Sequence, residues 1–233
     1  LQQLQNWGQA NDKHAVYWLD IFSHSLQLYK TPLAIDQLFT QQRANTQCSW
    51  IFVSATLSVN GDFSHYQQQM GLGSAKTLCL ASPFNYAQQG LLYVPEQMPL
   101  PNNPIYHESL LKIIVPILEQ TEGRAFLLCT TLSAMKILYE RLQEIFAQRN
   151  LSFPLLMQGT RSKRTLLDEF CKAGNAVLIG SQSFWEGVDV PGNALSVVII
   201  DKLPFAPPDD PIVAARLQQL ARDGRNGFME YTL

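Results

Sequence analysis

The sequence predicts an α/β protein in which a parallel sheet is flanked by helices. From residue 106 onward, apolar runs of strand length alternate with amphipathic stretches of helix length. Strands that are linked through helices form parallel sheets whose two faces are both covered. The chain has 233 residues, of which 46% are hydrophobic, so it can bury a substantial core.

The first part of the chain gives weaker signals. Residues 1–47 are rich in Gln and follow no clear period, so no element type is assigned to them. Residues 49–53 favour β-structure and predict a strand, as do residues 77–80. Residues 63–71 predict a short helix that is closed by its final glycine.

A proline-rich segment separates this part from the rest. Five prolines and one glycine lie between residues 83 and 104. Proline at this density opposes both helix and central strand, so the segment is the candidate linker. It divides the chain into a first part, 1–82, and a second part, 105–233.

The second part carries the regular alternation on which the fold class depends. Its helices are expected where apolar residues recur three and four positions apart, and its strands where apolar runs are short and bounded by turns. The expected helices cover 106–123, 135–146, 166–174 and 213–220, and the expected strands cover 125–130, 153–157, 176–179 and 195–200.

Composition gives information on the ligands and the location of the protein. The formal net charge is −2 at pH 7 and 15% of residues are charged, which gives no sign of a strongly basic nucleic-acid binder, although a basic groove can lie on a neutral protein. No apolar run approaches the roughly 20 residues that cross a bilayer, so a soluble, cytoplasmic protein without membrane contact is expected. The chain has no initiator Met, and we expect a fragment of a longer protein.

The four cysteines are widely spaced. No pair has the C-x-x-C spacing of zinc or redox motifs, and no histidine lies beside them at zinc-finger distance. We expect buried, reduced thiols and no metal site in this chain.

The topology indicates where a ligand would bind. In an open parallel sheet, ligands collect beyond the carboxyl ends of the strands. The strand at 176–179 leads into a polar turn at 181–189 with hydroxyls, two acids, a Trp and a glycine, and hydroxyls also end the strand at 125–130. The four histidines lie in the first half, away from these ends, so acid–base catalysis by His is not expected. The residues suit a phosphate-rich ligand.

Specific motifs add a resemblance to this reading. The triplet at 54–56 (Ser-Ala-Thr), the strand at 126–131 with its following helix, and the stretch 180–192 resemble motifs III, IV and V of superfamily 2 helicases. The form Phe-Trp-Glu-Gly-Val-Asp at 184–189, followed by 201–211, resembles the DinG/YoaA branch of the XPD-like DNA helicases, and most nearly its YoaA members. By itself the triplet also fits an ordinary exit from a strand.

The resemblance implies two RecA-like domains, both incomplete here. Residues 1–82 would be the end of the first domain, and 105–233 would be most of the second, without motif VI. Helicases of this branch use ATP and Mg²⁺ to move 5′ to 3′ along single-stranded DNA. Their Walker A loop and D-E-x-H box are absent from this sequence, and their iron–sulfur cluster is expected in a region that this chain does not contain. The fragment alone is expected to be inactive.

The resemblance also implies roles for single residues. The implied residues are Ser54 and Thr56 for coupling ATP to the DNA cleft, Thr130, Thr131, Ser183 and Trp185 for contact with single-stranded DNA, and Glu186, Gly187 and Asp189 for the ATP cleft. Two other functions stay open from the residues alone. One is a non-catalytic α/β interaction module with Trp185 as a docking anchor, and the other is half of an RNA-directed helicase.

Three cations add a candidate contact. Arg161, Lys163 and Arg164 fall at the start of the helix expected at 166–174. The helix dipole disfavours cations there by about 0.3–1 kcal/mol each. A DNA phosphate would offset that cost, so the three residues are candidate DNA contacts. Solvated charges on a surface turn are the alternative.

Overall fold

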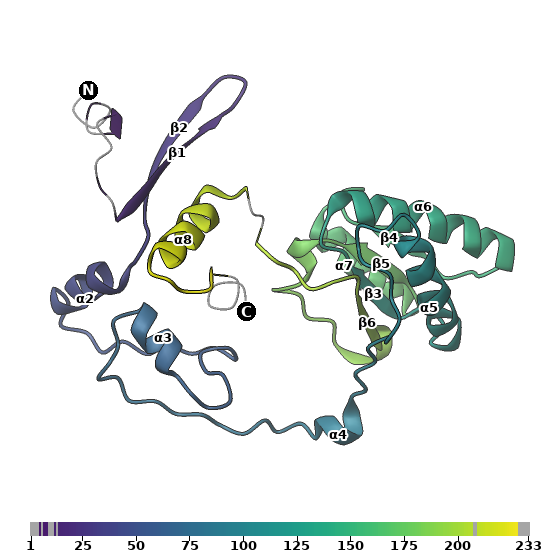
Figure 1. The fold of residues 1–233 in the computed structure, drawn as a ribbon. Helices are drawn as coiled ribbons and strands as arrows, with labels where there is room; N and C mark the ends of the chain where they lie inside the picture. The colour runs from purple at the N-terminus through teal and green to yellow at the C-terminus, as the bar shows by residue number, and fades with distance from the viewer. Residues whose placement is uncertain (1–4, 6, 9–11, 13, 207–208, 228–233) are drawn as a thin grey trace. The chain divides into compact units, whose positions relative to one another are not determined.

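The computed structural model describes residues 5, 7, 8, 12, 14–206 and 209–227. The chain forms two compact units, which are the described residues of Leu1–Leu91 with Phe205–Leu233, and Leu92–Pro204 (Figure 1). Residues 207 and 208, which fall inside the stretch 201–211 that carries part of the family resemblance, lie outside the described residues. The second unit holds most of the regular α/β alternation.

The second unit is built on a parallel sheet, as the sequence predicts, and its described residues contribute four strands. Ala125 lies opposite both Val177 and Val197, and all neighbours in the sheet are parallel. The two central strands are buried along their whole length, which is typical of a parallel sheet covered on both faces. In sheet order the strands are β4 (Leu155–Met157), β5 (Val177–Gly180), β3 (Ala125–Leu128) and β6 (Val197–Ile200).

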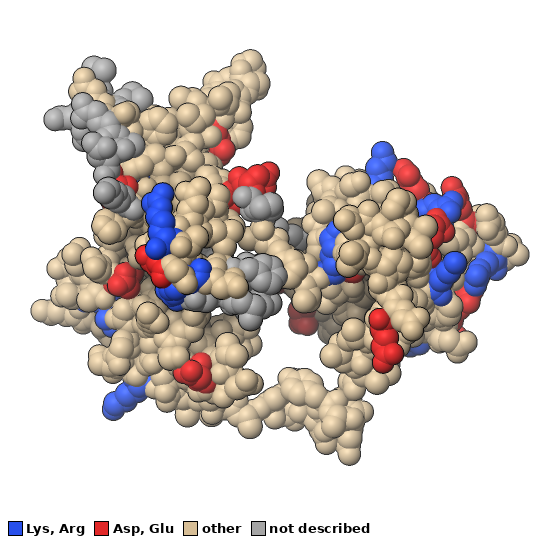
Figure 2. Space-filling model, viewed as in Figure 1, with Lys and Arg blue, Asp and Glu red and all other residues tan. Residues whose placement is uncertain are grey.

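Two long helices, α5 (Tyr106–Gln120) and α6 (Leu132–Arg149), pack together on one face of this sheet. Exposed ion pairs join them, such as the 2.9 Å contact between Arg149 Nη1 and Glu119 Oε1. Acidic and basic side chains are interspersed on the viewed surface of this unit (Figure 2). Exposed pairs contribute only about 0–1 kcal/mol each, so apolar packing is the main attachment of the helices.

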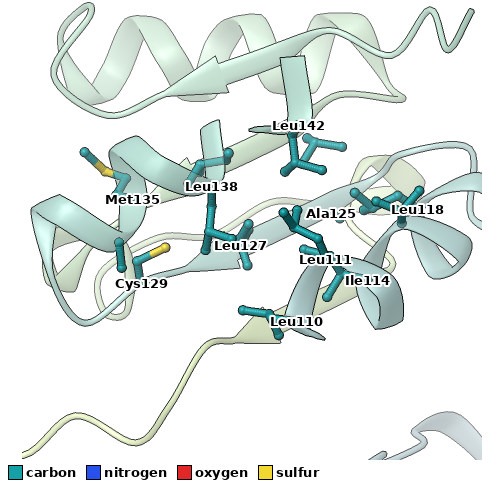
Figure 3. Close-up of a cluster of buried hydrophobic side chains, with 14 of the residues drawn as sticks. Leu110, Leu111, Ile114, Leu118, Ala125, Leu127, Cys129, Met135, Leu138 and Leu142 are labelled. Atoms are coloured by element: carbon teal, nitrogen blue, oxygen red, sulfur yellow. The ribbon is translucent and has the colours of Figure 1, made fainter. Parts of the chain in front are cut away.

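Alternation along β3 divides the core into two layers. Leu127 faces α5 and α6 and packs with the fully buried Leu118 and Leu138 (Figure 3). Phe126, one residue earlier, faces the opposite side and packs with Phe170 of α7 (Lys163–Ala173). Side chains of successive strand residues point to opposite faces, so one strand supplies both layers.

Local signals explain where the helices begin and end. The side chain of Thr131 caps α6 by accepting from Ala134 N, and that of Ser162 caps α7 by accepting from Thr165 N. Helix α7 ends at Gly174, whose φ of 70° is left-handed and suits glycine. The helices predicted at 106–123, 135–146 and 166–174 are therefore confirmed, with small shifts of their ends.

The first unit contains an antiparallel hairpin of β1 (Ala15–Ile21) and β2 (Leu26–Pro32). The rings of Trp18 and Tyr29, which are cross-strand partners, stack with centroids 4.0 Å apart. Helix α8 (Pro211–Arg222) packs on β1 and confirms the helix expected at 213–220. The other helices of this unit in the described residues are α2 (Asp36–Ala44), α3 (Ser64–Gln69) and α4 (Tyr86–Gln89), and α3 confirms the helix predicted at 63–71.

Two predicted strands are absent. The described residues 49–53 and 77–80 belong to no sheet. Ile51 and Val53 are 84% and 88% exposed, and Leu78 is 76% exposed. A β-favouring run becomes a strand only when a neighbour supplies its hydrogen bonds, and the described residues supply none here.

The cysteine prediction is only partly right. Cys129 is buried in the core, whereas Cys48, Cys79 and Cys171 are exposed. The apolar positions of an isolated sequence window do not reveal which small residues the fold covers. No helix among the described residues has the length and apolar character needed to cross a membrane.

Candidate nucleic-acid and nucleotide site

The parallel sheet brings several loops to one edge. Because all its strands are parallel, the residues that follow β3, β4, β5 and β6 emerge at the same carboxyl edge. These are Thr130 and Thr131 after β3, Gln158 after β4, Ser181–Asp189 after β5, and Asp201 after β6. The predicted strand ends of the second unit thus share one surface.

Asp201 holds the exit of β3. Its Oδ1 accepts from Thr130 N at 3.0 Å and from Lys202 N at 2.8 Å, and its own N donates to Leu128 O. The residue is only 7% exposed, and this burial raises the pKa of its carboxyl group above the usual 3.8, although Lys202 and the two backbone donors oppose the shift. The start of the Thr130–Thr131 turn is therefore fixed by a buried carboxyl group.

Helix α5 also contacts Asp201. The hydroxyl of Tyr106 donates to the backbone oxygen of Asp201. Burial, and then the charge of Asp201, raise the pKa of the Cys129 thiol to about 12, so this thiol stays protonated at neutral pH.

His107 lies near enough to lower the pKa of Asp201, so the expectation that every histidine lies away from the strand ends is wrong for His107.

The two threonines after β3 differ in what their side chains can offer. Thr131 is exposed, and its Oγ1 accepts from Ala134 N at 3.2 Å as the cap of α6. Its hydroxyl hydrogen remains available to donate to a ligand. The Oγ1 atom of Thr130 is buried and has no hydrogen-bond partner among the described residues. Thr131 is therefore the more accessible of the two.

The loop after β5 is held from its first residue. Ser181 donates from both its N and its Oγ to Gln158 Oε1, at 2.7 and 3.1 Å. Phe184 is 3% exposed and lies on Gly180, where an added Cβ would come within 2.9 Å of the Phe184 ring. Trp185 is half-buried and packs on the same core layer. The loop is thus a packed turn with an anchored ring.

The remaining predicted residues of this loop face solvent. Ser183, Glu186 and Asp189 are exposed, and neither carboxylate has a partner in the described part of the chain. Gly187 has a φ of 65°, a left-handed value that L side chains rarely adopt. The polar groups assigned to DNA and to ATP are therefore free to meet a ligand.

The three predicted cations have different surroundings. Arg161 precedes the helix and pairs with Glu169 of α7. Lys163 is the first residue of α7, and its Nζ donates to Ser183 O. Arg164 is exposed and has no partner among the described residues. They do not form one basic cluster aimed at a common ligand.

Ser54 and Thr56 belong to the first unit. Both are exposed, their hydroxyl oxygens lie 3.1 Å apart, and Thr56 N donates to Ser54 Oγ. The triplet therefore forms its own small hydrogen-bonded turn, as hydroxyl residues often do.

Sequence reasoning missed the supports of the site rather than its exposed groups. The contact of Tyr106 with Asp201 joins residues 95 positions apart, and that of Gln158 with Ser181 joins residues 23 positions apart. Asp201 was recognisable as a polar residue after an apolar strand. Gln158 was recognisable in the same way, as the residue after the strand at 153–157, whereas Tyr106 had no local signal. The partners of both residues are set by the packing of the sheet and helices.

The comparisons with known proteins agree with this architecture. The family of helicase C-terminal domains matches residues 114–233. A sheet of parallel strands with helices on both faces is the RecA-like arrangement expected from the sequence.

Several named relatives match nearly the whole chain. It is 41% identical over 231 residues to the "ATP-dependent DNA helicase YoaA" of Escherichia coli, covering 99% of this chain and 36% of that protein. The YoaA helicase of Haemophilus influenzae is 42% identical over 226 residues, covering 97% of this chain and 34% of that protein. The "ATP-dependent helicase DinG" of Mycobacterium tuberculosis is 34% identical over 230 residues, covering 96% of this chain and 32% of that protein.

The chain thus spans about a third of the length of these relatives. A solved structure, the Hef helicase domain of Pyrococcus furiosus, is similar at 20% identity over 52% of this chain and 22% of that chain, with a TM-score of 0.33. The match to residues 114–233 covers more than half of the sequence and contains the loop after β5. The chain therefore belongs to the family of helicase C-terminal domains.

Proposed function

We propose that this chain is part of an ATP-dependent DNA helicase of the DinG/YoaA type. One observation carries the proposal: exposed hydroxyl groups of Thr131 and Ser183 follow neighbouring strands at one edge of the sheet, in a chain of the helicase C-terminal domain family. The names of the relatives support ATP and DNA as its ligands. Residues 1–82 would close the first RecA-like domain, 83–104 would link the two, and 105–233 would form most of the second.

The DNA contacts would be made by groups that do not read sequence. Thr131, Ser183 and Arg164 would donate to phosphates, which gives grip on any single strand, as a translocating motor requires. Thr130 has a buried Oγ1 atom and an N–H group bound to Asp201, so it would support the turn rather than contact the strand directly. Trp185 would stack on a base with the part of its ring that remains exposed, which contributes about 1–3 kcal/mol per base. Movement would run 5′ to 3′, the direction of the helicase branch that the sequence resembles.

The nucleotide would lie against residues 186–189 of the same loop. Glu186 and Asp189 would orient a partner arginine or the ribose, and Gly187 would allow close approach of the backbone. Ser54 and Thr56 would transmit the ATP state to the DNA contacts. ATP bound with Mg²⁺ supplies the phosphoryl-transfer chemistry of such motors.

This chain has no Walker A lysine and no D-E-x-H acids, so it would not hydrolyse ATP alone. An iron–sulfur cluster does not fit the described residues, where no three His, Cys, Asp or Glu side chains gather as metal ligands. Such a cluster would belong to another part of the parent protein. A DNA substrate also supports a cytoplasmic location.

Binding of labelled single strands tests the proposal. Fluorescence anisotropy with an oligothymidylate should detect weak binding that falls as salt rises, because phosphate contacts release counterions. A Thr131→Ala/Trp185→Ala double variant should bind more weakly, and Lys136→Ala on the exposed face of α6 is the matched control. Equal binding by the double variant and the parent chain would contradict the DNA contacts.

The two other functions have distinct results in the same experiment. Preference for an oligouridylate over the oligothymidylate would indicate an RNA-directed helicase. No binding to either strand would favour the interaction module. Turnover of ATP by the purified chain, above a blank without protein, would contradict its assignment as an inactive part of the motor.

A further inference from the structure

Lys163 is bound within the protein. The Nζ atom lies 2.6 Å from the backbone oxygen of Ser183 and 3.4 Å from that of Glu186. It also lies 5.5 Å from the centre of the Phe184 ring, within the range of a cation–π contact. One ammonium group thus contacts three residues of the loop after β5.

These contacts supply hydrogen-bond donors to carbonyl groups of the loop. Residues Gln182–Phe184 form a single short turn, in which Phe184 N donates to Ser181 O. The carbonyl groups of this turn and of the residues after it have no strand ladder to join and need donors from elsewhere. Lys163 supplies donors to two of them, while Gln158 holds Ser181 at the start of the loop.

The position of Lys163 is otherwise unfavourable. It is the first residue of α7, where the helix dipole repels a cation. A ligand phosphate is one group that would offset this repulsion, but two backbone oxygens and the face of a ring already contact the ammonium group. The lysine therefore has a partner before any nucleic acid binds.

The two neighbouring cations, Arg161 and Arg164, differ from Lys163 in their partners. Arg161 is paired with Glu169, and Arg164 has no partner among the described residues. Both lie within two positions of Lys163 and share its exposed setting. Arg164 is thus the natural comparison for a cation that is free to meet a phosphate.

We infer that Lys163 is a positioning residue, which holds the Ser183–Glu186 segment in place, rather than a phosphate contact. It acts through Ser183 and Trp185, so its effect on DNA rests on the proposed function. The effect of Lys163 on the loop itself does not depend on the proposed function. Loss of the ammonium group would free the loop carbonyls and release Trp185 from its fixed position on the core.

The loop can be followed without DNA. The chain labelled with 5-fluorotryptophan gives one ¹⁹F resonance for each Trp, and Trp185→Phe identifies the resonance of Trp185. Lys163→Met should shift or broaden that resonance and leave those of Trp7, Trp18 and Trp50 unchanged. Lys163→Arg should largely restore it, and Arg164→Met should leave every resonance in place. An unchanged Trp185 resonance in Lys163→Met would overturn the inference.

DNA binding then separates positioning from direct contact. Each phosphate contact to a single strand contributes about 0.7 to the slope of log affinity against log salt. Lys163→Met should weaken oligothymidylate binding severalfold with the slope unchanged, whereas Arg164→Met should reduce the slope by about 0.7. A slope reduced by that amount in Lys163→Met would make Lys163 a phosphate contact and overturn the inference. A shifted resonance in a chain that binds no DNA would support positioning and contradict the proposed function alone.

Discussion

Thr130 N donates to Oδ1 of Asp201 across 3.0 Å, and this bond joins the chain leaving β3 to the chain leaving β6. The same oxygen accepts from Lys202 N at 2.8 Å. One carboxyl group thus satisfies two backbone donors at the edge where the predicted ligand contacts lie, and it does so from a position that is 7% exposed.

Replacing Asp201 by Ala should destabilise the protein by about 1–3 kcal/mol, because two N–H groups at a buried site would lose their acceptor. Asp201→Asn keeps an oxygen in place and should cost less. Urea unfolding followed by circular dichroism measures the difference. Asp168→Ala, on the exposed face of α7, is the control and should change little. Equal stability of Asp201→Ala and Asp168→Ala would contradict the bond's importance.

The same residue should make stability depend on pH. Burial raises the pKa of Asp201 above the usual 3.8, so the folded chain holds this proton more tightly than the unfolded chain. The stabilising contribution is complete below about pH 3.8 and is lost as pH rises through the raised value. In Asp201→Asn this loss disappears. Urea unfolding at several pH values should therefore show the parent chain losing stability relative to Asp201→Asn as pH increases, and a constant difference would contradict the raised pKa.

The buried cysteine should react far more slowly than the three exposed ones. Cys129 is buried and its pKa is raised to about 12, so its thiolate is rare at pH 8. Cys48, Cys79 and Cys171 are exposed and should react with iodoacetamide in the folded chain. Mass spectrometry of the peptides should find Cys129 modified only after urea is added. Rapid modification of Cys129 without urea would show that the core layer at this point opens easily.

Gly180→Ala should disturb the loop after β5. An added Cβ would lie 2.9 Å from the ring of Phe184, which is itself buried, so the ring or the strand must move. Overpacking of this kind typically costs about 1–3 kcal/mol. Gly73→Ala is the matched control, since nothing lies within 4 Å of its added Cβ. Urea unfolding compares the two, and a loss no greater than that of Gly73→Ala would mean that the ring yields freely.

The parts of the fold that the sequence predicts well are those with local causes. The strand Val177–Gly180 and the helix Lys163–Ala173 were predictable because burial and period are visible within a few residues, and Gly174 marks the end of the helix. The predicted strand at 49–53 failed for the opposite reason. Ile51 has the right side chain, but a strand also needs a neighbour that no local pattern can supply.

The same distinction holds for the site. Strand ends pointed to the loops after β3 and β5, and the helicase resemblance selected Thr131, Ser183 and Asp189 within them, all of which are exposed. The partner of Lys163 was not predictable, because Ser183 lies 20 positions away and meets it only after β4, α7 and β5 have packed. The exposed groups of the candidate site can thus be found from sequence, whereas its supports emerge from the fold.

The strand order β4-β5-β3-β6 has a mechanical consequence. Gln158 ties the end of β4 to the end of β5, and Asp201 ties the end of β6 to that of β3. The edge is therefore made of two braced pairs, and between them Cys129 N donates to Gly180 O at 2.8 Å. A displacement of either loop would therefore pass first to the strand that is joined to it, and then across the Cys129–Gly180 bond to the other pair.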